Sequence, residues 1–66
     1  MIYPEEVQEL ILEVHQILQR VERLKSRAPN PDVGRQIKLI DAELMDAAHN
    51  LEVLLDLLAQ APRDLV

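Results

Sequence analysis

The side chains of this sequence that could carry out chemistry are its carboxylates and two histidines. Two acidic pairs, Glu6 with Glu9 and Glu43 with Asp46, are spaced three residues apart. On a helix each pair would share one face, where carboxylates can bind magnesium. Both pairs fall on faces turned away from the neighbouring apolar positions, which excludes a metal cage inside a helical bundle. We therefore expect solvated surface carboxylates and no metal site at these positions.

Asp46 and His49 form a second pattern, because they have the carboxylate–histidine spacing of di-iron four-helix bundles. Such sites also need inward-pointing glutamates on the other helices. The first half of the chain offers only Glu13 and His15, which lie on different faces. We expect His15 and His49 to lie at the surface or its boundary, and we expect no bound cofactor.

Asp41 is the acid with the most unusual setting, because it lies at the edge of an apolar stripe. Its surroundings resemble the second helix of the small two-helix aspartyl-phosphate phosphatases of sporulation. The resemblance rests on three segments, Pro31-Asp32-Val33, Ile40-Asp41 and Leu44-Met45. That family carries a serine four residues before its functional aspartate, and here the position is Ile37. The resemblance implies a phosphatase using Asp41 as one alternative, whereas the residues favour an ion pair with Arg20 or Arg23 of a partner.

Nucleophilic catalysis has no support in this sequence. It contains no cysteine, and its single serine, Ser26, lies near an expected helix end. No glycine-rich loop that could hold a phosphate is present either. We therefore expect the protein not to be an enzyme.

The elements that position these groups are predicted to be two helices. Pro4 suits a first helical position, and Glu5 and Glu6 complement the positive end of the helix dipole. Apolar residues then alternate at intervals of three and four, which predicts a helix over about residues 4–27. Its stripe consists of Val7, Leu10, Val14, Ile17, Val21 and Leu24, and it is widened by Ile11 and Leu18.

The second helix is predicted over about residues 31–60, after a turn of residues 28–30 and before a short tail of residues 61–66. Pro29 and Pro31 end the first helix, and Asn30 is expected to cap the second. A link this short makes the helices antiparallel. The second stripe consists of Ile37, Ile40, Leu44, Ala47, Leu51, Leu54 and Leu58, and it is widened by Val33, Ala48 and Leu55. The predicted fold is one all-α domain, a two-helix antiparallel hairpin.

Each stripe is wider than one facing helix can cover. A chain of 66 residues without cysteine also has little other means of stabilisation than association. We expect the alternating positions to pair within the hairpin, so that the widening residues stay exposed in a monomer. Those residues are Ile11, Leu18, Ala48 and Leu55. Two hairpins that form a four-helix bundle would bury them, and a two-fold homodimer is the simplest such assembly.

The charges predict how the two hairpins run. Six of the seven basic residues gather near the turn, and most acids lie elsewhere. The basic residues at the turn are Arg20, Arg23, Lys25, Arg27, Arg35 and Lys38. The second helix also begins with bases and ends with Asp56, against its own dipole. An antiparallel dimer, with the turn of one hairpin beside the open end of the other, would bring opposite charges together.

The sequence therefore predicts a small acidic interaction or assembly module that self-associates as an antiparallel homodimer. The net charge of −5 argues against general nucleic-acid affinity. No membrane span and no signal peptide are recognisable, so we expect a cytoplasmic protein. A co-chaperone or antitoxin-like hairpin that covers a helical client, and an RNA-binding dimer using the basic residues, stay open as alternatives. A further partner could contact those bases or an outer row on the second helix, Leu39, Val53 and Leu57.

Overall fold

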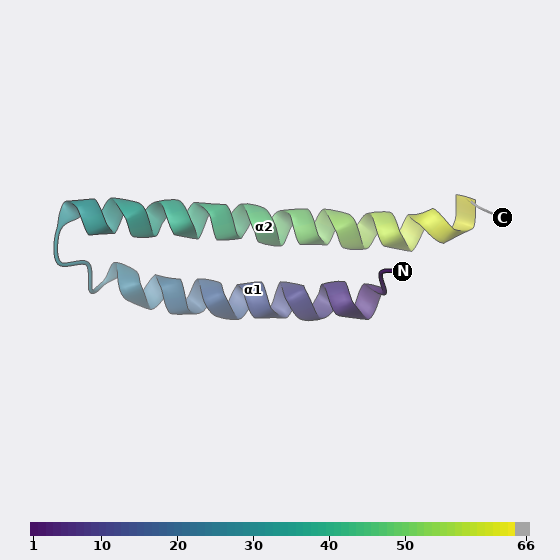
Figure 1. Ribbon diagram of the computed structural model, residues 1–66, viewed down its shortest axis with the longest axis horizontal. Coiled ribbons are helices and arrows are strands. Elements are labelled where there is room, and N and C mark those ends of the chain that lie inside the picture. The colour runs from purple at the N-terminus through teal and green to yellow at the C-terminus, as the bar shows by residue number, and fades with distance from the viewer. Residues whose placement is uncertain (65–66) are drawn as a thin grey trace.

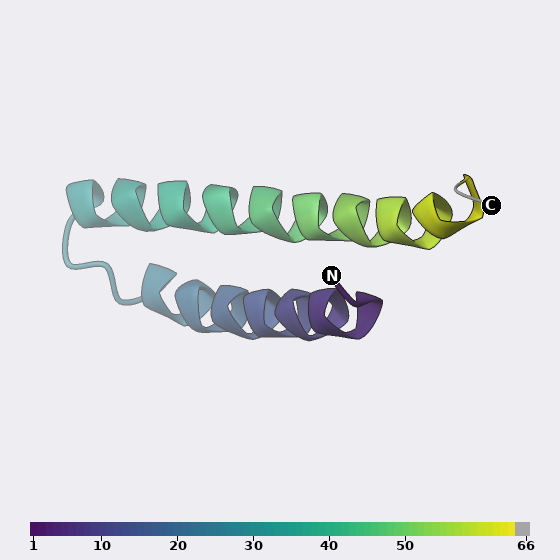
Figure 2. The same ribbon diagram turned by 45° about the vertical axis from the view of Figure 1, so that its right-hand side comes forward.

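The computed structural model describes residues 1–64, with side chains described up to residue 60. The fold is all-helical, as predicted, and consists of α1 (Pro4–Lys25) and α2 (Pro31–Asp64). The helices pack side by side in antiparallel directions, in both views (Figures 1 and 2). The hairpin measures 56 × 15 × 14 Å, and its radius of gyration of 15.9 Å exceeds the about 11 Å typical of a compact chain of this length. Much of the surface of each helix is therefore uncovered.

Local sequence accounts for both ends of α1. Tyr3 adopts an extended conformation before Pro4, and its carbonyl accepts the backbone N–H of Glu6 at 3.0 Å. At the other end the Ser26 hydroxyl donates to the carbonyl of Arg23 at 3.0 Å, and the N–H of Arg27 donates to Leu24 at 3.0 Å. This tight final turn ends α1 at Lys25, two residues before the expected end, because Pro29 disfavours helical geometry at the residue before it.

The start of α2 confirms the predicted cap. The side-chain oxygen of Asn30 accepts the N–H of Val33 at 2.9 Å, which satisfies one of the free donors of the first turn. Gly34 lies in this turn against Ala28, with open space for a methyl group, since an added Cβ would be 3.7 Å from the Cβ of Ala28. Close packing therefore does not require a glycine here.

The other end of α2 extends further than expected. The helix continues to Asp64, beyond the expected end at about residue 60. Pro62 lacks the N–H for one backbone hydrogen bond, but this loss does not prevent a final helical turn. The part of the expected tail that covers residues 65–66 lies outside the described residues.

The helices pack through a different set of positions from the one expected. The contact positions of α1 are Val7, Ile11, Val14, Leu18, Val21 and Lys25, and those of α2 are Gly34, Ile37, Asp41, Leu44, Ala48, Leu51, Leu55 and Leu58. We refer to these residues as the α1–α2 contact. Val7, Val21, Ile37 and Ala48 are its buried members. The expectation that Ile11, Leu18, Ala48 and Leu55 stay exposed was wrong, because each is buried or half-buried.

The reason is that each helix contains two overlapping heptad patterns. In α1 both patterns share Val7, Val14 and Val21, and they differ in whether Leu10 and Ile17 or Ile11 and Leu18 complete them. The hairpin uses the second pattern, which brings Lys25 opposite Asp41 in an ion pair. The first pattern, which the sequence analysis assigned to the hairpin, is left facing solvent on one side.

Candidate interaction surface

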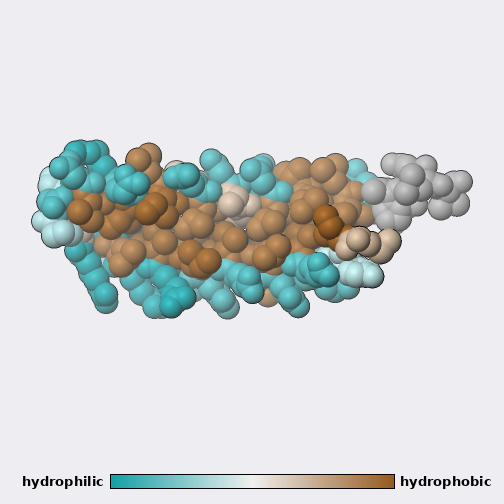
Figure 3. Space-filling view, in the orientation of Figure 1, coloured by the Kyte–Doolittle hydropathy of each residue, from teal (hydrophilic) through white to brown (hydrophobic). Residues whose placement is uncertain are grey.

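An exposed apolar face runs along one side of the hairpin and covers both helices (Figure 3). On α1 it contains Leu10, Ile17 and Leu24, and on α2 it contains Val33, Ile40, Ala47 and Leu54. We call these seven residues the apolar face. Within each helix they are seven residues apart, so they form one straight row. In the sequence, each residue of the two rows comes directly before a residue of the α1–α2 contact. Because the helices are antiparallel, residues with this same offset lie on the same side of the hairpin.

Five of the seven side chains of the apolar face are large and exposed, whereas Ala47 is small and Leu54 is half-buried. Leu10, Ile17 and Leu24 are 47%, 43% and 47% exposed, and Ile40 is 41% exposed. Tyr3, which is 52% exposed, extends the α1 row by one more repeat of seven residues. Single exposed aliphatic side chains are common, but a contiguous patch of this kind is unusual on a monomer.

Polar residues border the apolar face on both sides. Along α1 the border is Glu6, Glu13, Arg20 and Arg27, and along α2 it is Gln36, Glu43 and Asn50, followed by the apolar Leu57; all eight are exposed. We call the α1 border the charged row. Within residues 1–60 none of its four members forms an ion pair, since the ion pairs there involve Lys25 with Glu22, Lys25 with Asp41, and Arg35 with Asp32.

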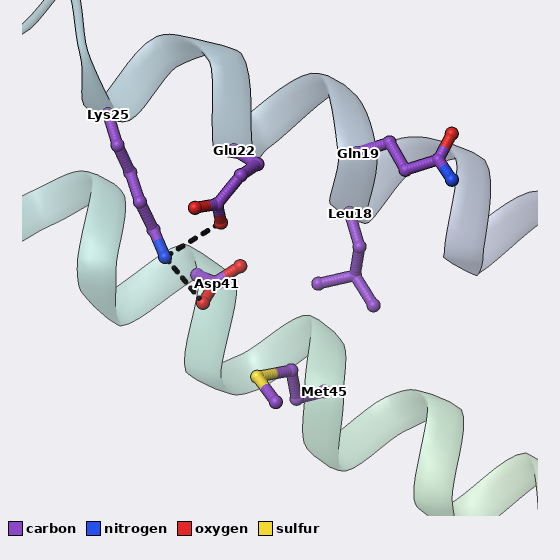
Figure 4. A pocket seen from close by; sticks show the side chains of 6 residues that line it. All are labelled: Leu18, Gln19, Glu22, Lys25, Asp41 and Met45. Atoms are coloured by element: carbon purple, nitrogen blue, oxygen red, sulfur yellow. Dashed lines mark hydrogen bonds and ion pairs between the residues drawn. The ribbon is translucent and has the colours of Figure 1, made fainter.

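The opposite side of the hairpin carries a small cluster of charged groups (Figure 4). The Lys25 ammonium lies 2.9 Å from a carboxylate oxygen of Glu22 and 3.1 Å from one of Asp41. Hydrogen bonds to Glu22 and then to Asp41 raise the pKa of Lys25 above its ordinary value. Asp41 is the most enclosed of the three, with only 17% of its side chain exposed. The lysine is therefore held as a cation that binds α1 to α2.

This arrangement corrects the sequence analysis on one point. Asp41 was expected to pair with Arg20 or Arg23 of a partner, and instead it pairs with Lys25 of its own chain. Asp41 lies inside the α1–α2 contact and not at its edge. The sequence contains a signal for this pair, because Lys25 continues the series of Ile11 and Leu18 by seven residues, and Asp41 precedes Ala48 by seven. Two opposite charges in corresponding heptad positions indicate facing residues.

Two shallow grooves open on this second, more polar side. One, of about 430 Å³, lies beside the Lys25 cluster, and the other, of about 440 Å³, lies nearer the open end. The first is lined by Leu18, Gln19, Glu22, Lys25, Asp41 and Met45 (Figure 4), and the second by Gln8, Ile11, Leu12, Glu52 and Leu55. In the first groove Lys25 pairs with Glu22 and Asp41, and in the second the polar lining residues are Gln8 and Glu52.

The other candidate residues from the sequence are dispersed. Both acidic pairs and both histidines are exposed, and within the described side chains no three acids or histidines are close enough to hold a metal ion. Ser26 is bonded to the backbone, and Arg35 pairs with Asp32. By their spacing, Arg20, Arg23 and Arg27 share one side of α1, whereas Lys38 lies on the polar side of α2. The predicted outer row of α2, Leu39, Val53 and Leu57, is exposed by 57%, 41% and 57%.

The apolar face is thus the largest group of exposed apolar side chains that the two helices place on one side of the hairpin. In the part of the chain that the structure describes, neither helix contains a segment long and apolar enough to cross a bilayer. Comparison with known proteins gives no match to a family model, to a curated protein or to a solved structure.

Proposed function

We propose that this protein is a non-enzymatic interaction module that self-associates, with two hairpins packing their apolar faces together into a four-helix bundle. The observation that supports this proposal is the direction of the strongest apolar pattern. The rows of Val7, Val14 and Val21 and of Leu10, Ile17 and Leu24 are adjacent on α1. Only the first of these rows belongs to the α1–α2 contact, and the second faces solvent.

A four-helix bundle explains why the pattern is rotated in this way. A helix in such a bundle has two neighbours, so its main apolar pattern points between them, toward the bundle axis. The residues on either flank of the pattern then contact one neighbour each. On α1 one flank holds Ile11, Leu18 and Lys25, which face α2, and the other flank is the charged row, which has no neighbour in the hairpin. The missing neighbour is a helix of a second copy.

Burial of the apolar face is the driving force of the proposed dimerisation. Fully burying a leucine or isoleucine is worth about 1.5–3 kcal/mol, so burying the exposed half of each is worth about 1 kcal/mol. Twelve large side chains, six from each copy, would contribute on the order of 10 kcal/mol, against an association cost of about 4–15 kcal/mol. The gain and the cost are of similar size, so the proposed dimer should dissociate on dilution, and its melting temperature should rise with protein concentration.

The test compares two neighbouring residues of α2 that lie on different sides. Ile40 belongs to the apolar face, and Leu39 lies on the outer side, exposed by 57%. In sedimentation equilibrium we expect the natural protein to be a dimer, Ile40→Glu to be a monomer, and Leu39→Glu to remain a dimer. The proposal would be contradicted by a natural protein that is still monomeric after its concentration has been raised 100-fold, or by an Ile40→Glu variant that still dimerises.

A helical client is the second candidate occupant of the same face, because two helices of another protein could complete the bundle equally well. This function is that of a co-chaperone or an antitoxin-like inhibitor. The exposed apolar face supports it, but the charged row favours a second copy, because it contains two acids followed by two bases and can therefore pair with itself. A monomer that gains helical structure only on adding such a client would favour this candidate.

A further inference from the structure

We infer that in the dimer α1 packs antiparallel against α1 of the second copy, and α2 against α2, about a two-fold axis that passes between the copies near Ile17 and Ala47. This inference rests on the proposed self-association and specifies its geometry. A pair of hairpins joined through their apolar faces has one alternative arrangement. In that alternative the turns lie at the same end and α1 faces α2 of the second copy.

The charged row selects between the two arrangements. Its residues Glu6, Glu13, Arg20 and Arg27 are each seven apart, border the apolar face and are exposed. An antiparallel copy of the same row presents its residues in the reverse order. Glu13 then faces Arg20 of the second copy, and Glu6 faces Arg27. The symmetry repeats both contacts, so the antiparallel α1 pair contains four opposite-charge contacts and none between like charges.

The alternative arrangement matches fewer charges. The Lys25–Asp41 ion pair sets the levels of the two helices, and it places the charged row beside Leu57, Asn50, Glu43 and Gln36 of an adjacent α2 in the second copy. Only Arg20 then meets an opposite charge, that of Glu43. Glu13 faces an amide, and Glu6 faces a leucine. The alternative therefore offers half as many opposite-charge contacts in the dimer.

α2 supports the same axis independently. The midpoint of the charged row lies between residues 13 and 20, close to Ile17 on the apolar face. Counting from the Lys25–Asp41 pair, Ile17 is level with residue 49 of α2, and the nearest residue of the apolar face is Ala47, two residues away. Ala47 also lies at the middle of α2, which spans Pro31–Asp64, so two antiparallel α2 helices would overlap along their whole length. Its small side chain permits close approach of the two helices where the axis passes.

Charge-reversed variants test the pairing directly. Glu6→Arg with Glu13→Arg makes the charged row wholly basic, and Arg20→Glu with Arg27→Glu makes it wholly acidic. Each variant alone is expected to dimerise on the order of tenfold to a hundredfold more weakly than the natural protein, because four attractive contacts become repulsive. A 1:1 mixture of the two should form a heterodimer as tight as the natural dimer, and the variant with all four changes should regain the homodimer.

A matched control separates this pairing from general charge effects. Glu5→Arg with Glu52→Arg makes the same change in net charge and also places a base in the first turn of α1, but it alters the polar side. The control is expected to dimerise normally. Circular dichroism of each protein establishes that α1 still forms.

A cysteine experiment gives a second measure, since the chain has no cysteine of its own. Ile17→Cys is expected to form a disulfide with itself on oxidation. Leu10→Cys is expected to form one only with Leu24→Cys in a mixed sample. In the alternative arrangement Ile17→Cys would cross-link with Ala47→Cys and not with itself.

The outcomes separate the two proposals. Absence of any dimer of the natural protein overturns the proposed function. A normal dimer whose charge-reversed variants show no preference for the mixture, or in which Ile17→Cys cross-links only with Ala47→Cys, overturns the antiparallel α1 pairing and leaves the self-association intact.

Discussion

The α1–α2 contact and the apolar face are built from overlapping heptads, yet they differ in chemistry. The contact includes the ion pair of Lys25 with Asp41 and the small residues Gly34 and Ala48. The apolar face contains no charge, and all its members except Ala47 are large aliphatic residues. The less apolar of the two heptad patterns thus forms the α1–α2 contact, and the more apolar one is exposed to solvent. A polar pair within a helix contact can fix its register, while a uniform apolar surface provides the driving force for association.

A charge introduced into each surface should have the largest effect on stability and association, and the effect should differ between the two surfaces. Val21 is 8% exposed within the α1–α2 contact, so Val21→Asp should destabilise the hairpin by about 3 kcal/mol or more, because the carboxylate would be buried without a partner. We expect the cooperative thermal transition to disappear at every protein concentration. Ile40→Glu, on the apolar face, should instead keep a transition whose midpoint no longer depends on concentration.

The measurement is circular dichroism during heating, at protein concentrations that differ by two orders of magnitude. Val21→Ala serves as the control, because it removes volume without introducing a charge. A cooperative transition of Val21→Asp equal to that of the natural protein would show that the α1–α2 contact is not the core of the hairpin.

Removing the ion pair of Lys25 with Asp41 should have a smaller effect on stability, and this effect concerns the α1–α2 contact. Lys25→Met alone leaves the Asp41 carboxylate enclosed without its cation, and Asp41→Leu alone leaves the lysine without its main cross-helix partner, so each should lower the urea midpoint. The double variant makes both heptad patterns apolar and should recover the midpoint or exceed it, as replaced ion pairs often do. We also expect its hairpin to lose the preference for one pattern over the other.

Two measurements follow from this prediction. Urea unfolding gives the midpoints of the single and double variants, and backbone NMR of the double variant shows whether one set of amide signals remains. A double variant that is less stable than either single variant would mean that the ion pair stabilises the fold beyond setting its register.

Particular residues show how far the sequence predicts this fold. The apolar spacing predicts both helices, and Pro29, Pro31 and Asn30 predict the turn and the cap that the structure contains. The choice between heptad patterns is not predictable in the same way, because Val7, Val14 and Val21 belong to both. A rotation of each helix by half the width of its stripe exchanges them, and that rotation depends on contacts between helices.

The same rotation explains why the candidate site was only partly predicted. The sequence predicts a stripe too wide for one partner, but its alternating spacing assigned Leu10, Ile17 and Ile40 to the inside of the hairpin. It also placed Asp41 at the edge of the stripe, which led to the incorrect expectation of an arginine from a partner. Treating Lys25 and Asp41 as positions of the heptad, despite their charge, would have placed both patterns correctly.

The smallest expected effect is a dependence on pH that belongs to the α1–α2 contact alone. Glu22 and Asp41 raise the pKa of Lys25 above its ordinary value of 10.5. Because this pKa is higher in the folded state than in the unfolded chain, the contribution to stability is complete below about pH 10 and is lost as the pH rises through the folded-state pKa. The natural protein should therefore lose more stability than Lys25→Met as the pH rises from about 10 to about 12.

Comparing these two proteins isolates the ion pair, since they differ only at residue 25. The urea midpoint at each pH is the measurement, taken at one protein concentration so that association contributes equally. The apolar face has no ionisable group, so the dimerisation constant should change little with pH over this range in either protein. An equal loss of stability in both proteins would mean that Lys25 does not hold α1 to α2 in solution, and the distinction between a charged inner contact and an uncharged outer face would then lose its basis.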